Sequence, residues 1–401
     1  MVRRDSESSC SSHGSHTHED FSLANDIVVT KYNVAAEIAN AVLKEVIAGV
    51  KEGVEAASLC DLGDKLITEK TGKMYKKEKG ITKGIAMPTC VSVDNCICYY
   101  SPLRSDPVLT LKNGQVVKVE LGVHIDGFIA TLAHTVVVGA SKDNKVTGKL
   151  ADLIKGTYDA LEVAIRTLRV GNSNTEVTNV IDKVAAEYGV TPIENMVSHQ
   201  LERNEISGEK QIIQNPGEKQ KSEMEKVNID KHEAYAIDVL FTTGKGKPKD
   251  IDVRTTVFKK NESVQYQLKM KASRVFFTEC NKLYGTMPFS LRSFGEEVKA
   301  KMGVVECEKH GLLTPYPVLY EKEGDVVAQF KATVLVMPNG LLKIAGLPLE
   351  ADVYEPTATL KDAELVKTLK SALKPKKKKD AKKEGDAKDE KAAEPAAEKA
   401  K

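Results

Sequence analysis

The same order of elements, a pair of amphipathic helices followed by apolar strands, occurs twice along this chain of 401 residues. In the first half, Val34, Ile38, Val42 and Val46 recur every four residues, which places them on one face of a helix. A shorter apolar repeat and several β-branched runs follow, and the second half has the same order. The repeat predicts an α/β (α+β) chain whose two similar halves face each other.

The expected elements can be placed by residue number. Helices are expected at residues 34–46, 59–66, 150–165 and 177–184. Strands are expected at residues 91–97, 116–123, 125–138, 234–241 and 326–337, and Asp126-Gly127 has the chemistry of a hairpin turn. A helical insertion is expected at residues 256–317, with helices at 269–283 and 289–302 that Pro288 and Gly303 delimit.

Both ends of the chain differ in composition from its middle. Residues 1–20 are rich in Ser and His, and residues 361–401 are rich in Lys, Ala and Glu. Neither end has enough apolar residues to bury a core, so we expect a disordered leader, one domain at residues 21–360 and a disordered basic tail. A lysine block in the tail suits nuclear or nucleolar targeting, phosphate contact or solubility alone. It consists of Lys376, Lys377, Lys378 and Lys379.

Composition excludes several classes of protein. Hydrophobic residues make up 41% of the sequence, enough for one large or two moderate cores. No apolar run reaches the roughly 18 residues of a membrane span, and the seven cysteines include no Cys-x-x-Cys. We expect a protein of the cytoplasm and nucleus without membrane insertion, a disulfide framework or a zinc finger. Nothing in the sequence indicates a homodimer, so we expect a monomer.

Polar residues interrupt three largely apolar segments, at residues 86–102, 117–127 and 328–335. They resemble the active-site strands of type 2 methionine aminopeptidases. This resemblance implies a pita-bread (creatinase/methionine aminopeptidase-like) fold with an insertion of the type 2 kind. In those enzymes, Asp, Glu and His side chains hold two cations about 3.5–4 Å apart. The matching positions in this chain are Tyr99, Glu120, Thr131, His199, Asp238 and Lys331.

Most of the metal-binding side chains of that pattern are therefore replaced. His199 is unchanged, and Glu120 and Asp238 keep a carboxylate on a side chain that differs by one methylene. Thr131 and Lys331 supply no carboxylate, and an ammonium about 4 Å from a dication is repelled by about 8 kcal/mol at an effective dielectric near 20. We expect no metal cofactor. We expect Lys331 to lie among Glu120, Asp238 and His199 and to neutralise the carboxylates.

Further stretches extend the resemblance across residues 20–360, among them Val-Val-Thr-Lys-Tyr (28–32), Ile-Ile-Gln-Asn-Pro (212–216) and Met-Gly-Val-Val-Glu-Cys (302–307). Together they resemble the proliferation-associated, ErbB-receptor-binding family, a non-catalytic branch of the aminopeptidase-like proteins. The resemblance implies binding to rRNA and the large ribosomal subunit, and roles in ribosome biogenesis, translation and growth regulation. It also implies receptor-kinase tails and transcriptional regulators as partners, and a location in the cytoplasm, nucleus and nucleolus.

Basic residues gather before and within the insertion and in a second cluster before the first active-site-like segment. Such clusters suit a surface that faces phosphates of rRNA or another structured RNA, although a solvated helix face has the same composition. No standard RNA-binding module is present, so recognition of backbone and shape is expected. The candidates are Arg254, Lys259, Lys260, Lys269, Lys271 and Arg274, then Lys76 and Lys77, and the tail lysines named above.

Two alternatives to a non-catalytic, ribosome-binding protein stay open from the sequence. The first is an active metal-dependent methionine aminopeptidase that uses His199, Asp238 and Glu120. The second is a scaffold whose pocket binds peptides without hydrolysing them.

Overall fold

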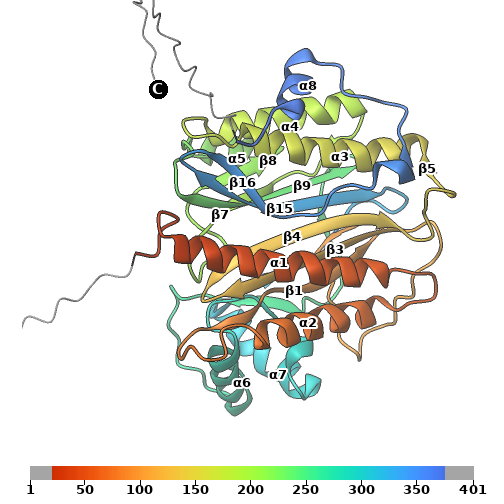
Figure 1. Ribbon diagram of the computed structural model, residues 1–401. Helices are drawn as coiled ribbons and strands as arrows, with labels where there is room; N and C mark the ends of the chain where they lie inside the picture. The colour runs from red at the N-terminus through yellow and green to blue at the C-terminus, as the bar shows by residue number, and fades with distance from the viewer. Residues whose placement is uncertain (1–19, 375–401) are drawn as a thin grey trace, which may run out of the picture.

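A nine-stranded antiparallel sheet runs through the part of the chain that the computed structural model describes, residues 20–374 (Figure 1). Its strands follow the order β1-β3-β4-β15-β9-β7-β8, while β16 pairs with β15 and β6 pairs with β9. These strands are β1 (Lys83–Val93), β3 (Val116–Ile125), β4 (Phe128–Val137), β6 (Thr191–Pro192), β7 (Met196–Leu201), β8 (Gln211–Gln214), β9 (Glu233–Thr242), β15 (Val327–Met337) and β16 (Gly340–Ala345).

Two halves of similar construction meet within this sheet. In the first half, helices α1 (Asp26–Ala48) and α2 (Ala56–Gly72) pack on β1, β3 and β4. In the second half, α3 (Gly148–Thr167) packs on β9 and β15 and against α4 (Asn174–Tyr188), with the short α5 (Glu218–Glu223) near β8 (Figure 1). The halves join where β4 pairs with β15, at Ala133 and Lys331. Each half buries its own apolar core between helices and sheet.

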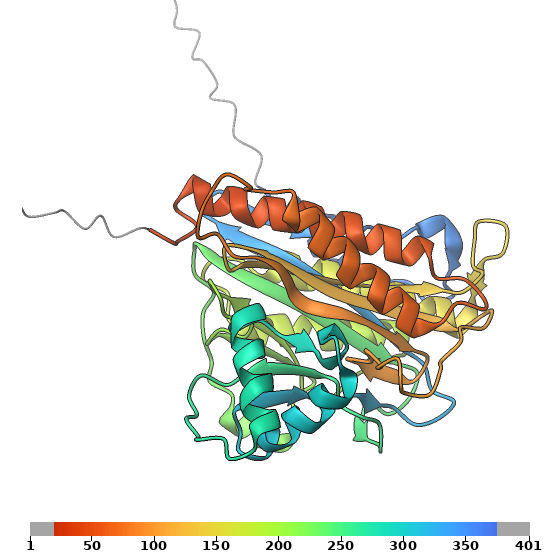
Figure 2. The same ribbon diagram turned by 90° about the horizontal axis from the view of Figure 1, so that it is seen from below.

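Smaller elements complete the described part of the chain. The insertion contains β11 (Val257–Lys260), α6 (Lys271–Leu283), β12 (Phe289–Ser290), the 3-10 helix η1 (Leu291–Ser293), α7 (Glu297–Lys309) and β13 (Leu313–Tyr316). Elsewhere lie β2 (Cys96–Cys98), β5 (Val146–Thr147), β10 (Lys249–Asp250), β14 (Leu319–Tyr320), the 3-10 helix η2 (Ala351–Val353), β17 (Tyr354–Glu355) and α8 (Ala363–Lys370). Figure 2 shows the insertion on the side of β1 away from α1 and α2.

The four helices and four of the five strands expected outside the insertion are present, with bounds that differ from the expected ones by up to eight residues. All four expected helices are present as α1 to α4, because their apolar faces are buried against the sheet. Asp126 and Gly127 connect β3 and β4 with positive φ angles of 55° and 80°, the conformation that this pair favours in a tight hairpin. The expected strand at residues 91–97 is divided instead between β1 and β2.

The second helix of the insertion was expected at residues 289–302, and this is wrong. The segment begins with strand β12, and the helix is α7, Glu297–Lys309. Gly303 does not end a helix but allows α7 to approach α6. A Cβ atom at position 303 would lie 2.4 Å from Cβ of Phe276, so the glycine is required by helix packing.

The expected end of the folded domain at residue 360 is too early. Residues 363–370 form α8, which packs against α3 through the buried Leu365. The main-chain N–H of Leu341 also donates to the carbonyl of Leu373 at 2.9 Å. The apolar residues 365, 369 and 373 recur every four positions, so this segment has a helical face to bury although it precedes a lysine-rich region. Residues 1–19 and 375–401 lie outside the described residues.

Membrane spans and disulfides are both missing from the described residues. No helix between residues 20 and 374 has the length and apolarity needed to cross a membrane. Six cysteines of the described chain are buried and free: Cys60, Cys90, Cys96, Cys98, Cys280 and Cys307.

Candidate functional site

The central strands bring together five of the six positions that match aminopeptidase ligands. Glu120, Thr131, Lys331, Asp238 and His199 lie on β3, β4, β15, β9 and β7, which are consecutive strands of the sheet. Lys331 is directly opposite Asp238 in the β9–β15 pair. The sixth position, Tyr99, follows β2 and has a positive φ of 61°. Its ring meets that of Tyr316, at the end of the insertion, edge to face at 5.1 Å.

Lys331 lies between the two carboxylates of this cluster. Its Nζ atom is 2.9 Å from Oδ2 of Asp238 and also donates to Oε1 of Glu120. All three side chains are buried, each less than a tenth exposed. Gln329, two residues earlier on β15, donates from Nε2 to both carboxylate oxygens of Asp238 at 3.0 and 3.2 Å. The cluster is therefore an ion-pair network supported by a neutral amide.

The protonation of the cluster follows from its burial. Burial raises the pKa of Asp238 to about 6, although the Lys331 ammonium favours the carboxylate. Burial by itself disfavours the charged form of Lys331, but the Asp238 and Glu120 carboxylates more than offset this and raise its pKa above the ordinary value. Burial and the Lys331 cation lower the pKa of His199 to about 3, so His199 is a neutral imidazole at physiological pH.

A cavity of about 300 Å³ opens beside this ion-pair network. Three buried polar atoms around it have no hydrogen-bond partner among the described residues: Oε2 of Glu120, Oγ1 of Thr131 and Nδ1 of His199. Buried polar groups are normally satisfied by protein or ordered water, so these atoms indicate that the cavity holds water or a polar ligand. Apolar lining residues include Met87, Tyr99, Met196, Ile206 and Tyr316.

The donor set does not fit a pair of divalent metal ions. A dication close to Glu120 and Asp238 would stand beside the Lys331 ammonium, which repels it and already neutralises part of the carboxylate charge. Thr131 offers only a hydroxyl at another ligand position. Within residues 20–374, no group of three or more His, Cys, Asp or Glu side chains is arranged to hold a metal ion.

The sequence did not indicate every residue of this site. Gln329 could have been found, because residues two apart on a strand share a face and Gln329 therefore lies beside Lys331. Tyr316 could not, because it reaches the cavity from the end of the insertion and no local pattern links it to Tyr99.

The basic residues expected to face RNA fall into different environments. Lys269, Lys271 and Arg274 are exposed at the start of α6, and Lys76 and Lys77 are exposed in the loop before β1. Arg254 is half-exposed and lies 3.4 Å from Oδ1 of Asp106. Two others are less available: Lys259 pairs with Glu205 and is only 15% exposed in its side chain, and Lys260 lies 3.8 Å from Glu262. The four tail lysines at residues 376–379 lie outside the described residues.

Similarity to known proteins agrees with the geometry of the sheet and its cavity. Residues 30–247 match the family described as metallopeptidase family M24. The chain belongs to this family, and the pita-bread fold expected from its sequence is confirmed. Within the family, it belongs with the ErbB-3-binding and proliferation-associated proteins, as the following similarities show.

An Arabidopsis thaliana protein named ErbB-3 binding protein 1 is 44% identical over 92% of this chain and 92% of its own length. Proliferation-associated protein A of Dictyostelium discoideum is 41% identical over 89% and 91%. A Schizosaccharomyces pombe relative named curved DNA-binding protein is 39% identical over 91% and 95%. Among solved structures, a thermophilic Arx1 is similar with a TM-score of 0.81 and 31% identity, over 88% of this chain and all of that chain. None of these relatives is named as a peptidase.

Proposed function

We propose that this protein is a non-catalytic member of the aminopeptidase-like family that binds rRNA on the large ribosomal subunit. In this role it would act in ribosome biogenesis, translation and growth regulation, in the cytoplasm, nucleus and nucleolus. The observation that carries the proposal is the position of Lys331, whose ammonium pairs with Glu120 and Asp238 where the family's enzymes require metal ions.

Exposed cations on the insertion support the binding part of the proposal. The carboxylate of Glu306 accepts hydrogen bonds from the N–H groups of Lys269 and Met270, at 2.7 and 3.0 Å. Arg274 donates to the carbonyls of Leu268 and Lys269 at 3.1 and 2.7 Å. Both the N–H and the C=O groups of the backbone before α6 are therefore bonded, which fixes its conformation. The side chains of Lys269 and Lys271 project from this fixed backbone into solvent, which suits contact with phosphates.

The name of the Schizosaccharomyces pombe relative supports the same chemistry, because it describes a protein that binds DNA. Contacts to phosphates do not by themselves distinguish DNA from RNA, since both present the same charged backbone. The choice of rRNA rests on the family resemblance seen in the sequence.

Salt-dependent co-sedimentation with purified ribosomal subunits tests the proposal. We expect the protein to pellet with the large subunit and to be released as salt rises, because cations from solution compete with its lysines for the phosphates. The double variant Lys269→Glu/Lys271→Glu should release the protein at lower salt. Lys259 and Arg274 are left unchanged in this variant, because one is paired with Glu205 and the other holds the backbone before α6.

A matched control is the double variant Lys51→Glu/Lys112→Glu. Both lysines are exposed and neither forms an ion pair with a described residue. They lie on adjoining loops at the other end of the first half, where the N–H of Gly53 donates to the carbonyl of Leu111. Equal sedimentation of both double variants and the wild type would contradict a phosphate-binding role for the insertion.

The cavity beside Lys331 supports a second candidate function, which is compatible with the first. Three unpartnered polar atoms in a cavity with both polar and apolar lining residues suit the amino group and first side chain of a peptide. Calorimetric titration with a Met-Ala-Ser peptide would test this, with Glu120→Gln expected to weaken binding. Release of methionine from the same peptide would instead indicate an active aminopeptidase and would contradict the main proposal.

A further inference from the structure

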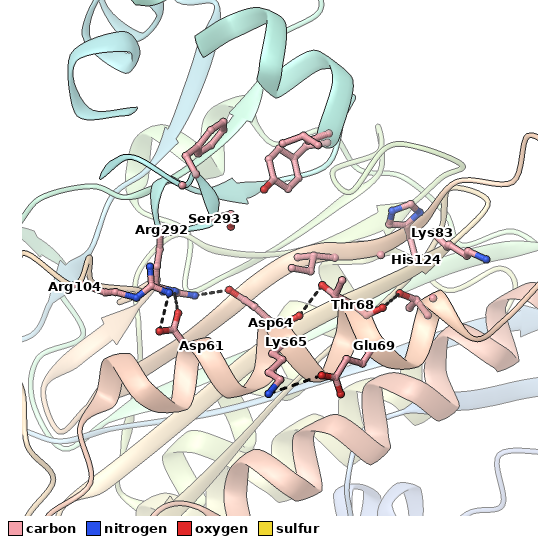
Figure 3. Close-up of a pocket in the computed structure, with 18 residues that line it drawn as sticks. Asp61, Asp64, Lys65, Thr68, Glu69, Lys83, Arg104, His124, Arg292 and Ser293 are labelled. Carbon is pink, nitrogen blue, oxygen red and sulfur yellow. Dashed lines mark hydrogen bonds and ion pairs between the residues drawn. The ribbon is translucent and has the colours of Figure 1, made fainter. Parts of the chain in front are cut away.

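A groove of about 860 Å³ lies outside the cavity around Lys331 and shares no lining residue with it (Figure 3). One wall is the outer face of α2, with Asp61, Lys65 and Thr68. The opposite wall belongs to the insertion, with Leu283, Tyr284 and Phe294, and the start of β1 lies between the two walls. The groove therefore follows the edge of the central sheet.

Strand β1 is a terminal strand, and its later part is already covered on the outer edge. The N–H of Val91 donates to the carbonyl of Tyr100 at 2.8 Å. The N–H of Thr89 donates to Oδ1 of Asp64 at 2.8 Å, and the carbonyl of Thr89 accepts from the hydroxyl of Ser101 at 2.9 Å. From residue 89 onward, other parts of the chain therefore bond the main-chain groups on the outer edge of β1. Natural proteins cover sheet edges in this way, which prevents pairing with a strand of another chain.

The first residues of β1 are not covered in this way. The carbonyl of Thr82 accepts from the N–H of Asp126 at 2.6 Å, which fixes the register of β1 against β3. Because main-chain groups alternate in direction along an antiparallel strand, those of Lys83 and Ile85 point away from β3 and toward the groove. Within residues 20–374, the N–H and C=O groups of these two residues have no partner on that side.

The chemistry of the groove favours an acidic and apolar ligand. Apart from Lys83, the cations of the groove are paired with its carboxylates. Arg292 pairs with Asp61 at 2.8 Å and with Asp64. Arg104 pairs with Asp61 at 3.0 Å, and Lys65 lies 3.9 Å from Glu69. Lys83 has no carboxylate partner among the described residues and donates only to the carbonyl of Met74. The exposed lysines of the preceding loop add positive charge at the same end: Lys73, Lys76, Lys77 and Lys79. Leu283 provides an apolar wall and is 54% exposed.

We propose that this groove binds an extended segment of a partner protein by strand addition. The segment pairs with the free main-chain groups of Lys83 and Ile85, as in other complexes that extend a sheet. Its alternate side chains place apolar groups against Leu283 and Phe294 and a carboxylate near Lys83. Open main-chain groups beside an apolar wall match a peptide better than a nucleic acid, which offers neither strand hydrogen bonds nor aliphatic side chains.

The test is a selection from a displayed library of random peptides of about ten residues, the length of a long strand, against the full chain. Enriched peptides are expected to alternate apolar and acidic residues. The variant Leu283→Asp should weaken them about tenfold or more, since it places a charge on the apolar wall. The control variant Val305→Asp changes a residue that is 57% exposed on α7 and does not line the groove, so it should bind as the wild type does.

Hydrogen exchange provides the second readout. Binding of an enriched peptide should slow exchange of the amides of Lys83 and Ile85, which only pairing at this edge would do. The proposal is overturned if no peptide is enriched, if Leu283→Asp binds the enriched peptides normally, or if these amides stay unprotected. If no peptide is enriched and Leu283→Asp no longer sediments with ribosomes, the proposal is also overturned. The groove would then belong to the surface with which this protein binds the ribosome.

Discussion

The ammonium of Lys331 lies 2.9 Å from Oδ2 of Asp238, directly across the β9–β15 strand pair. The same ammonium pairs with Glu120 on β3, so one cation holds two carboxylates from separate strands. The pseudo-symmetric halves meet at this point, because Lys331 is also opposite Ala133 in the β4–β15 pair. The Lys331–Glu120 pair therefore connects the two halves of the fold, at positions that the sequence resemblance matches to the metal ligands of the aminopeptidases.

Removal of the cation should destabilise the protein strongly. In Lys331→Met, the two carboxylates stay buried without a counter-charge, and breaking a buried ion pair in this way costs about 3–5 kcal/mol. Urea unfolding of the variant and the wild type measures the difference.

The triple variant Glu120→Gln/Lys331→Met/Asp238→Asn is the matched control for the loss of charge balance. It removes both carboxylates together with the cation, so it should recover much of the lost stability. A Lys331→Met variant as stable as the wild type would contradict the role assigned to this lysine.

Arg292 should fix the insertion to the body of the protein. Its side chain is buried, and it bonds Asp61 at 2.8 Å and the carboxylate of Asp64 (Figure 3). It also donates to the hydroxyl of Ser101 at 2.6 Å. Arg292→Leu leaves Asp64 buried without its partner, so we expect a loss of about 3 kcal/mol. Limited proteolysis should then cut within residues 256–317 before the rest of the chain.

Arg104 provides a comparison for Arg292. It also pairs with Asp61, at 3.0 Å, but its side chain is 60% exposed. Exposed ion pairs contribute about 0–1 kcal/mol, so Arg104→Leu should leave the proteolytic pattern unchanged. If both variants are cut equally, the burial of Arg292 is not what holds the insertion.

The sequence predicted the repeated halves because each helix and strand has a regular apolar period. It also predicted which positions gather around Lys331, through the family resemblance. It could not predict the free edge of β1, because that edge depends on where residues 99–103 return to cover Val91 and Thr89 but not Lys83. Nor could it predict the bounds of α7, because a glycine that allows close helix packing has the same appearance in a sequence as one that ends a helix.

That difference between glycines can be tested with two alanine substitutions. Gly303→Ala places a Cβ atom 2.4 Å from Cβ of Phe276, so α6 and α7 must separate. We expect a cost of about 1–3 kcal/mol, typical of an overpacked site. Gly72→Ala, at the end of α2, meets nothing within 4 Å and should change stability by less than about 0.5 kcal/mol. Thermal unfolding of both variants provides the comparison, and equal stabilities would contradict the packing role of Gly303.

His134 should make the protein sensitive to mild acid. It is buried on β4, its ring meets Phe330 edge to face at 5.0 Å, and Nδ1 has no hydrogen-bond partner among the described residues. Burial and, to a smaller extent, the nearby Lys343 cation lower the pKa of His134 from 6.5 to about 4. Between these two values the unfolded chain binds a proton that the folded chain does not, so stability falls as pH falls below about 6.5.

At about pH 5 this difference amounts to about 2 kcal/mol relative to about pH 7.5. The variant His134→Leu has no imidazole at this position, so its free energy of unfolding should decrease by about 2 kcal/mol less than that of the wild type over the same pH range. Asp238, whose raised pKa acts in the opposite sense, and the buried His124 and His199 are present in both proteins and cancel in the comparison. Identical pH dependence of urea unfolding in the two proteins would show that His134 becomes protonated as readily in the folded chain as in the unfolded one.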